Sequence, residues 1–209
     1  MRLLIFITTV FLLSCGQNAS KKQETSSNDS VTTTKDTTVV TPAKPDTAST
    51  PEPTALSTSV NGFLNAKEGN KWHVLNDREA KWISGQFDYF IAPKRKENPD
   101  YPYIARGDFN GDGKTDLAAV VTNDTKTTFQ LAIILDAGND TRKIMYWDED
   151  IMEDAAISTI PKSTIEGFEG ERTKKVNMKA EGINVEYFEK ASFVLYWNGA
   201  AFKRIQTGD

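Results

Sequence analysis

Oxygen-bearing side chains recur at alternate positions in one short stretch of the sequence, residues 108–116. When Asp108 is counted as position 1, carboxylate or amide oxygens occur at positions 1, 3, 5 and 9, and glycine occurs at position 6. Calcium takes about six to eight oxygen ligands at about 2.3–2.6 Å, and a tightly turned loop brings alternate side chains to one centre. Gly113 permits the sharp turn, because glycine adopts backbone angles that other residues avoid. The spacing therefore predicts a calcium site with these ligands: Asp108, Asn110, Asp112, the backbone carbonyl of Lys114, and Asp116.

The charge of this stretch also favours a divalent cation. The carboxylates of Asp108, Asp112 and Asp116 repel one another, and a doubly charged ion would relieve that repulsion. We expect the Lys114 side chain to face solvent and water to complete the ligand shell. Magnesium fits less well, because it prefers a compact octahedron and keeps its own waters. An acidic, glycine-rich turn that binds no ion is the alternative.

The residues after the loop distinguish between families of calcium loop. EF-hand and dockerin loops place their last ligand at position 12, which is Ala119 here, and continue as helix. The run Leu-Ala-Ala-Val-Val over residues 117–121 instead predicts a β-strand. Residues 107–121 resemble the FG-GAP, or integrin-type, calcium loop, in which Gly-Asp-Phe-Asn-Gly-Asp-Gly-x-x-Asp precedes a strand. FG-GAP motifs usually recur around a β-propeller, but the sequence holds no second copy, which argues against a propeller.

The elements around the loop predict an α+β domain. Apolar residues within 60–75 indicate short helical or turn structure, and Asn76 with Glu79 three residues later is typical of a capped helix start over residues 76–83. Asn198-Gly199 between two apolar runs predicts a β-hairpin. We therefore expect a short N-terminal helical region packed on an antiparallel β-sheet. The expected strands are residues 117–121, 129–135, 143–147, 157–160, 175–178, 183–188, 193–197 and 202–205.

The N-terminus predicts export and a lipid anchor. Arg2 followed by the mostly apolar residues 3–13 is typical of a secretory signal, and this run is shorter than the roughly 20 apolar residues that span a bilayer. Residues 12–15, Leu-Leu-Ser-Cys, resemble the bacterial lipobox, which implies cleavage before Cys15 and lipidation of its thiol. Cys15 is the only cysteine, so no intramolecular disulfide forms. An ordinary signal peptide that happens to contain a cysteine is the alternative.

Residues 15–55 predict a lipidated, disordered tether, because they are rich in Ser, Thr and Pro and contain no aromatic residue. Three Asp-Ser/Thr pairs in it resemble the O-glycosylation motif of one phylum of Gram-negative bacteria, which implies glycans on Ser30, Thr37 and Thr47. Chance in a Thr-rich segment is the alternative. The domain boundaries are thus a signal peptide at residues 1–14, the tether at 15–55 and a single domain at 56–209.

Other candidate sites carry less information. His73 is the only histidine and lacks the context of a Ser-His-Asp triad, so we expect a surface or hydrogen-bonded side chain. The acidic residues at 148–154 are compatible with a solvated face, a second cation site or a carboxylate pair for glycoside hydrolysis. The many aromatic side chains are typical of core packing, with carbohydrate stacking as the alternative. The net charge of −4 argues against nucleic-acid binding.

The chain resembles the small, single-copy FG-GAP/VCBS-like lipoproteins of some Gram-negative bacteria. The resemblance covers roughly residues 100–209 and includes residues 188–192 and 196–199 near the end, but it implies no activity. We expect a monomeric outer-membrane lipoprotein, on the periplasmic side or the cell surface, with a structural calcium ion and no catalytic residues. Its domain would bind an envelope protein or glycan. A small carboxylate-dependent hydrolase of envelope polymers is the alternative function.

Overall fold

The computed structural model describes residues 53–82, 85–138 and 142–208. The predicted lipidation site Cys15, the three predicted glycosylation sites and the tether up to residue 52 lie outside these residues. Within the described residues, no helix is long and apolar enough to cross a membrane.

The first helix, α1 (Ala55–Glu68), begins where the tether was expected to end. The Thr54 hydroxyl caps it by accepting a hydrogen bond from the Ser57 backbone N–H at 3.1 Å. Apolar side chains recur at helical spacing, and Val60, Phe63 and Leu64 are buried against the first sheet. The helix ends at Gly69, whose backbone N–H donates to the carbonyl of Asn65.

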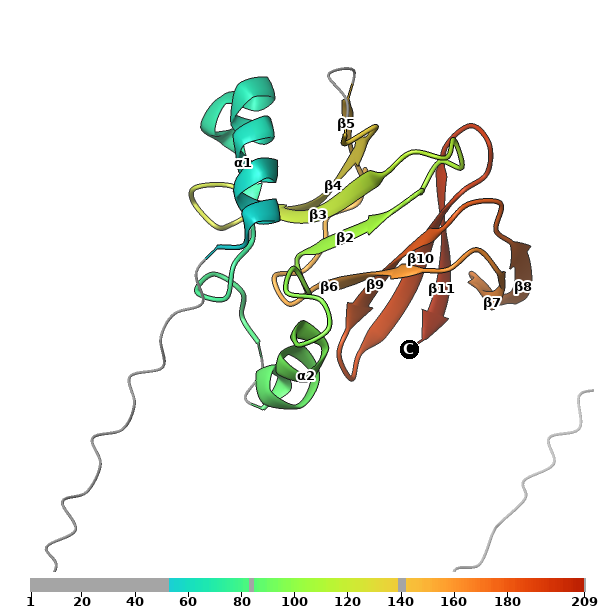
Figure 1. Cartoon of the computed structure of the whole chain (residues 1–209). Coiled ribbons are helices and arrows are strands. Elements are labelled where there is room, and N and C mark those ends of the chain that lie inside the picture. The colour runs from blue at the N-terminus through green and yellow to red at the C-terminus, as the bar shows by residue number, and fades with distance from the viewer. Residues whose placement is uncertain (1–52, 83–84, 139–141, 209) are drawn as a thin grey trace, which may run out of the picture. The chain divides into compact units, whose positions relative to one another are not determined.

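The first sheet is antiparallel and lies beside α1 (Figure 1). Its strands pair in the order β1-β3-β4-β5, and β2 pairs with β3 beside β1. Every residue of β3 is buried, as expected of a continuous apolar run covered on both faces. The bounds are β1 (His73–Val74), β2 (Ile104–Gly107), β3 (Asp116–Thr122), β4 (Phe129–Leu135) and β5 (Lys143–Tyr146).

The second sheet contains the C-terminal strands in the order β6-β9-β10-β11-β7-β8, and it is also antiparallel. The predicted hairpin at Asn198 joins β10 to β11, with Trp197 opposite Phe202. The Asn198 side-chain carbonyl accepts from the backbone N–H groups of Ala200 and Ala201, both at 2.9 Å, which closes the turn. The bounds are β6 (Ala156–Ile160), β7 (Thr164–Glu169), β8 (Arg172–Asn177), β9 (Gly182–Tyr187), β10 (Ala191–Trp197) and β11 (Phe202–Gly208).

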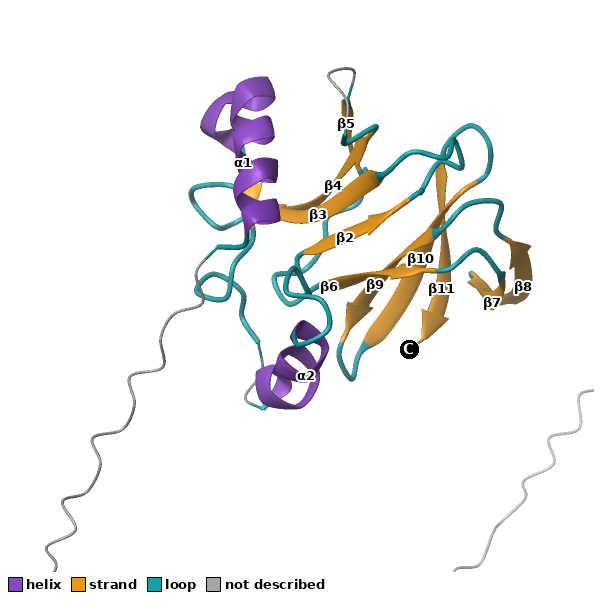
Figure 2. Cartoon of the chain, in the orientation of Figure 1, coloured by secondary structure: helices purple, strands orange, loops and turns teal. Residues whose placement is uncertain are grey.

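One hydrophobic core joins α1 and both sheets. Its members include Leu64 of α1, Val120 of β3, Ile183 of β9 and Leu195 of β10, all fully buried. The predicted α+β class is confirmed, with helices on one side of two antiparallel sheets and no propeller among the described residues (Figure 2). The predicted strands are divided between two sheets that share this core.

Two local predictions were wrong. Residues 77–80 form a turn, because the backbone N–H groups of Glu79 and Ala80 both donate to the Asn76 carbonyl at 3.0 Å, and the chain then leaves the helical path. The chain becomes helical only later, in a π-helical turn, η2 (Phe87–Ile91), which leads directly into α2 (Ala92–Arg95). Strands β1, β2 and β7 were not predicted, and β1 lies in the stretch where helical or turn structure was expected.

Candidate metal centre

The predicted calcium loop connects β2 to β3 as the tip of an antiparallel hairpin. Gly107 pairs with Asp116 at its base. The sequence predicts a helical region before the loop. This prediction was wrong, because the loop follows strand β2. A hairpin base fixes both ends of the loop, which restricts where the intervening side chains point.

Inside the loop, the predicted ligands organise the backbone. The Asp108 carboxylate accepts from the backbone N–H groups of Gly111 at 2.8 Å, Asp112 at 3.0 Å and Gly113 at 3.0 Å. The Asn110 side-chain carbonyl accepts from Asp112 N–H at 2.9 Å, and the Asp112 carboxylate accepts from Lys114 N–H, also at 2.9 Å. Gly113 has φ +81°, the left-handed conformation that favours glycine. The sharp turn expected there is therefore present.

Asp116 has the most demanding environment of the predicted ligands, since it is 0% exposed. Its carboxylate accepts three backbone N–H groups: Phe109 at 2.9 Å, Asn110 at 3.3 Å and Asp136 at 3.0 Å. Burial raises the pKa of Asp116, the three hydrogen bonds oppose that rise, and the nearby Asp112 charge adds to it. This carboxylate is thus held in place by the backbone even before any ion is considered.

Lys114 and Asp136 add a feature that the sequence did not reveal. The Lys114 ammonium lies 2.8 Å from Asp136 Oδ1 and 3.7 Å from Asp112 Oδ2, so it turns back over the loop although we expected it to face solvent. The hydrogen bond with Asp136 raises the pKa of Lys114. The hydrogen bond from the Lys114 backbone N–H lowers the pKa of Asp112. Asp136 is far from the loop in sequence and reaches it only through the pairing of β3 with β4.

The donor set suits a hard cation, because every predicted ligand offers oxygen. A carboxylate has about four acceptor positions, so the three N–H groups on Asp108 or on Asp116 leave room for a further partner. As they stand, no three His, Cys, Asp or Glu side chains among the described residues are arranged to hold a metal ion. Calcium binding stays a prediction that rests on the donor chemistry and the loop spacing.

The loop is attached to the second sheet as well as to the first. Glu181, just before β9, accepts from Asp108 N–H at 2.7 Å through its side chain, and its own N–H donates to the Asp108 carbonyl at 3.1 Å. Phe109 points into the shared core and is 0% exposed. The Thr159 hydroxyl of β6 donates to the Arg106 carbonyl at 2.8 Å. The loop is therefore a junction between the two sheets.

The acidic residues at 148–154 do not form a carboxylate pair. Glu149 pairs with Arg204, whereas Asp148 and Asp150 are exposed. The two remaining carboxylates bind separate lysines: Glu153 with Lys81 at 2.8 Å, and Asp154 with Lys190 at 2.6 Å. Each carboxylate is thus neutralised by its own cation or solvated, which does not favour the hydrolase hypothesis.

His73 and the aromatic side chains have structural surroundings. His73 Nε2 lies 3.0 Å from a Glu79 carboxylate oxygen, and among the described residues no serine hydrogen-bonds to the ring. The aromatic residues considered for sugar stacking are mostly buried, as Trp72 and Tyr103 are, or partly buried against the core, as Trp82 and Trp147 are. Tyr89 is the clear exception, at 79% exposed.

A charged network near α1 was missed by sequence reasoning. Arg95 binds Asp77 through two N–H groups, at 2.7 and 2.9 Å, and the Tyr103 hydroxyl donates to the same carboxylate at 2.9 Å. Burial raises the pKa of Asp77, but the hydrogen bonds from Arg95 and Tyr103 and the charge of Arg95 outweigh it, so the pKa is lowered overall. The network fixes the turn at 77–80 against α2.

Comparison of the chain with protein-family models, curated proteins and solved structures found no significant match.

Proposed function

We propose that this chain is a membrane-tethered extracytoplasmic lipoprotein whose domain is a calcium-stabilised binding module. In this proposal, lipid on Cys15 anchors the chain at the outer membrane, on its periplasmic side or at the cell surface. The tether at residues 15–55 then separates the membrane from the domain by roughly 35 Å, as expected for about 40 flexible residues. The partner is an envelope protein or glycan.

One observation supports the calcium part of the proposal most directly. The loop at residues 108–116 carries its predicted oxygen ligands at the junction of both sheets, with Asp116 buried and the Asp108 backbone hydrogen-bonded to Glu181. An ion bound there would link two layers of the domain, which is a structural role. Any ligand that binds only the folded state stabilises it, by about 2.7 kcal/mol when its concentration is about 100 times its Kd.

Thermal melting of the full chain in calcium and in chelator tests this part. Calcium should raise the Tm of the native chain more than that of Asp112→Asn, because the variant has one fewer carboxylate ligand. Asp112 suits this test because it is exposed. Asp148→Asn is the matched control, since it removes an exposed carboxylate outside the loop. If chelator leaves the Tm of the native chain unchanged, the calcium proposal is wrong.

Metabolic labelling with a radioactive fatty acid tests the anchor separately. The native chain should take up label and fractionate with membranes, and Cys15→Ala should do neither. Because the chain has a single cysteine, no other thiol can accept the lipid. An unlabelled, soluble native chain would refute the anchor without affecting the calcium result.

A further inference from the structure

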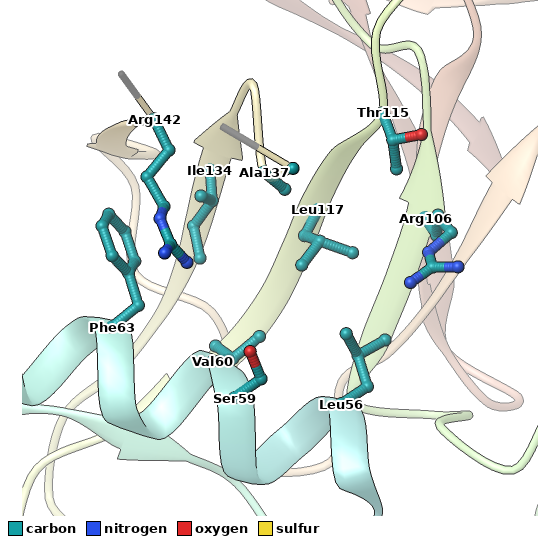
Figure 3. Close-up of a pocket in the computed structure, with 11 residues that line it drawn as sticks. Leu56, Ser59, Val60, Phe63, Arg106, Thr115, Leu117, Ile134, Ala137 and Arg142 are labelled. Carbon is teal, nitrogen blue, oxygen red and sulfur yellow. The ribbon is translucent and has the colours of Figure 1, made fainter. Parts of the chain in front are cut away.

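A cavity of about 310 Å³ lies between α1 and the first sheet (Figure 3). Its floor is apolar and consists of Leu117 of β3 and Ile134 of β4, with Val60 of α1 opposite them. Cavities that bind small molecules typically start at about 300 Å³ and combine an apolar lining with a few polar groups. This cavity therefore has the size and the floor of a small-molecule site.

Arg106 supplies the first of two positive charges. It occupies the same cross-strand row as the floor, since Arg106 pairs with Leu117 and Leu117 pairs with Ile134. β2 is an edge strand at this point, and Figure 3 shows the guanidinium directed toward the cavity. Among the described residues, Arg106 forms no ion pair, so its charge is available to a ligand.

Arg142 supplies the second charge from the opposite side of the floor. Its guanidinium lies over the Phe63 ring of α1, 4.6 Å from the ring centroid. Stacking covers one face of the planar group and leaves its N–H edges free, which is the arrangement that binds carboxylate or phosphate with two hydrogen bonds. No carboxylate within the described part of the chain pairs with it.

The charge of the cavity contrasts with that of the chain. The chain carries a net charge of −4, yet the lining residues in the described part include both arginines and no acidic residue. The Ser59 hydroxyl on α1 adds a further hydrogen-bonding group at the wall. A ligand that is anionic at one end and apolar at the other would interact with the arginines and also cover the apolar floor.

We propose that this cavity binds a small organic anion, a carboxylate or phosphate carried on an apolar body. Arg142, stacked on Phe63, binds the anionic group, and Arg106 adds positive charge from the other side of the floor. Leu117, Ile134 and Val60 contact the apolar body. This inference rests on the proposed function in so far as it names the ligand class of the binding module. It does not depend on the calcium ion or on the lipid anchor.

Isothermal titration of the full chain tests the proposal with three probes that share a six-carbon body: hexanoate, hexyl phosphate and 1-hexanol. At least one anion should bind saturably, and hexanol should bind at least tenfold more weakly. The two anions are compared directly, so the tighter one identifies the preferred group. If neither anion binds, or if hexanol binds as tightly as the better anion, the proposal is overturned.

Variants locate the binding site. Arg106→Gln and Arg142→Gln should each weaken binding of the better anion at least tenfold. Arg142→Lys should give an intermediate loss, because lysine keeps the charge without the planar pair of donors. Lys143→Gln is the matched control, since it removes one exposed positive charge next to Arg142 but outside the cavity. Unchanged melting of each variant shows that it is folded, and native affinity in both folded glutamine variants would refute the site.

The same titrations run in calcium and in chelator separate the two proposals. Anion binding in either condition supports the cavity whatever the melting experiments show. A calcium-dependent Tm without anion binding leaves the calcium proposal standing and overturns this one.

Discussion

Asp116→Asn should be the most informative single substitution in the loop, because it keeps the size of a fully buried side chain and removes its charge. The native carboxylate accepts backbone N–H groups from Phe109, Asn110 and Asp136. An amide has one oxygen and one nitrogen, and the nitrogen cannot accept. Whichever way the amide is turned, at least one buried N–H loses its partner.

The structure sets the size of the effect. An unsatisfied buried donor costs about 1–3 kcal/mol, and each remaining bond loses roughly 1 kcal/mol when its acceptor is neutral instead of charged. Burial raises the pKa of Asp116, so removing the charge also recovers part of a desolvation cost. These effects together predict that Asp116→Asn lowers the free energy of unfolding by about 2–4 kcal/mol in the absence of calcium.

Urea denaturation in chelator measures this loss, with Asp112→Asn as the control. Asp112 is exposed and accepts one backbone N–H, from Lys114, so its substitution should leave the urea midpoint near the native value. Calcium should stabilise both variants less than the native chain. If Asp116→Asn and Asp112→Asn have the same midpoint in chelator, the buried hydrogen bonds of Asp116 do not hold the loop, and the reasoning fails.

Two further substitutions test other parts of the fold. Asp77→Asn should reduce the free energy of unfolding by about 1–3 kcal/mol at pH 7. The folded pKa of Asp77 is lowered, so its contribution to the free energy of unfolding is complete above the ordinary pKa of about 3.9 and is lost as pH falls through the folded pKa. The urea curves of Asp77→Asn and the native chain should therefore differ less at pH 3 than at pH 7. An equal difference at both pH values would contradict this. Gly167→Ala would bring its Cβ into a clash with the Gln206 backbone carbonyl oxygen, so hydrogen exchange should speed up across β7 and β8. Gly62→Ala, with open space around its Cβ, is the control and should leave exchange there unchanged.

Short-range signals in the sequence were sufficient for much of the fold. The apolar runs at residues 117–121 and 129–135 became β3 and β4, and Asn198-Gly199 marked the β10–β11 hairpin, because a strand and its turn depend on neighbouring residues. The division into two sheets could not be predicted, since it depends on which distant strands pair. β7 was missed because its residues are mostly polar and exposed, with Gly167 in the middle.

The same distinction applies to the site. The spacing of Asp108, Asn110 and Asp112 is local, and the structure places these side chains in one turn of backbone hydrogen bonds. Asp136 joins the loop only through the register of β3 with β4, so no local pattern could indicate it. Asn76 shows the limit of a local pattern, since its side-chain oxygen accepts from Arg78 N–H as a helix cap does, but here the bond belongs to an isolated turn.

Two hydrogen bonds connect the calcium loop to the wall of the cavity. They predict that binding of an ion in the loop and binding of an anion in the cavity are coupled. Asp136 N–H donates to the buried Asp116 carboxylate at 3.0 Å, and the next residue, Ala137, donates to the Thr115 carbonyl at 2.9 Å. Thr115 and Ala137 both line the cavity. An ion that restrains Asp116 therefore also restrains one side of the cavity.

Binding free energies at two coupled sites change reciprocally, so calcium should raise the affinity for the better anion, and the anion should raise the affinity for calcium by the same factor. Because both hydrogen bonds already exist without the ion, we expect a factor near the low end of the usual range, about fivefold. Titration of each ligand with and without saturating amounts of the other measures both factors. If both ligands bind but neither changes the affinity of the other, these two hydrogen bonds do not transmit restraint from the loop to the cavity.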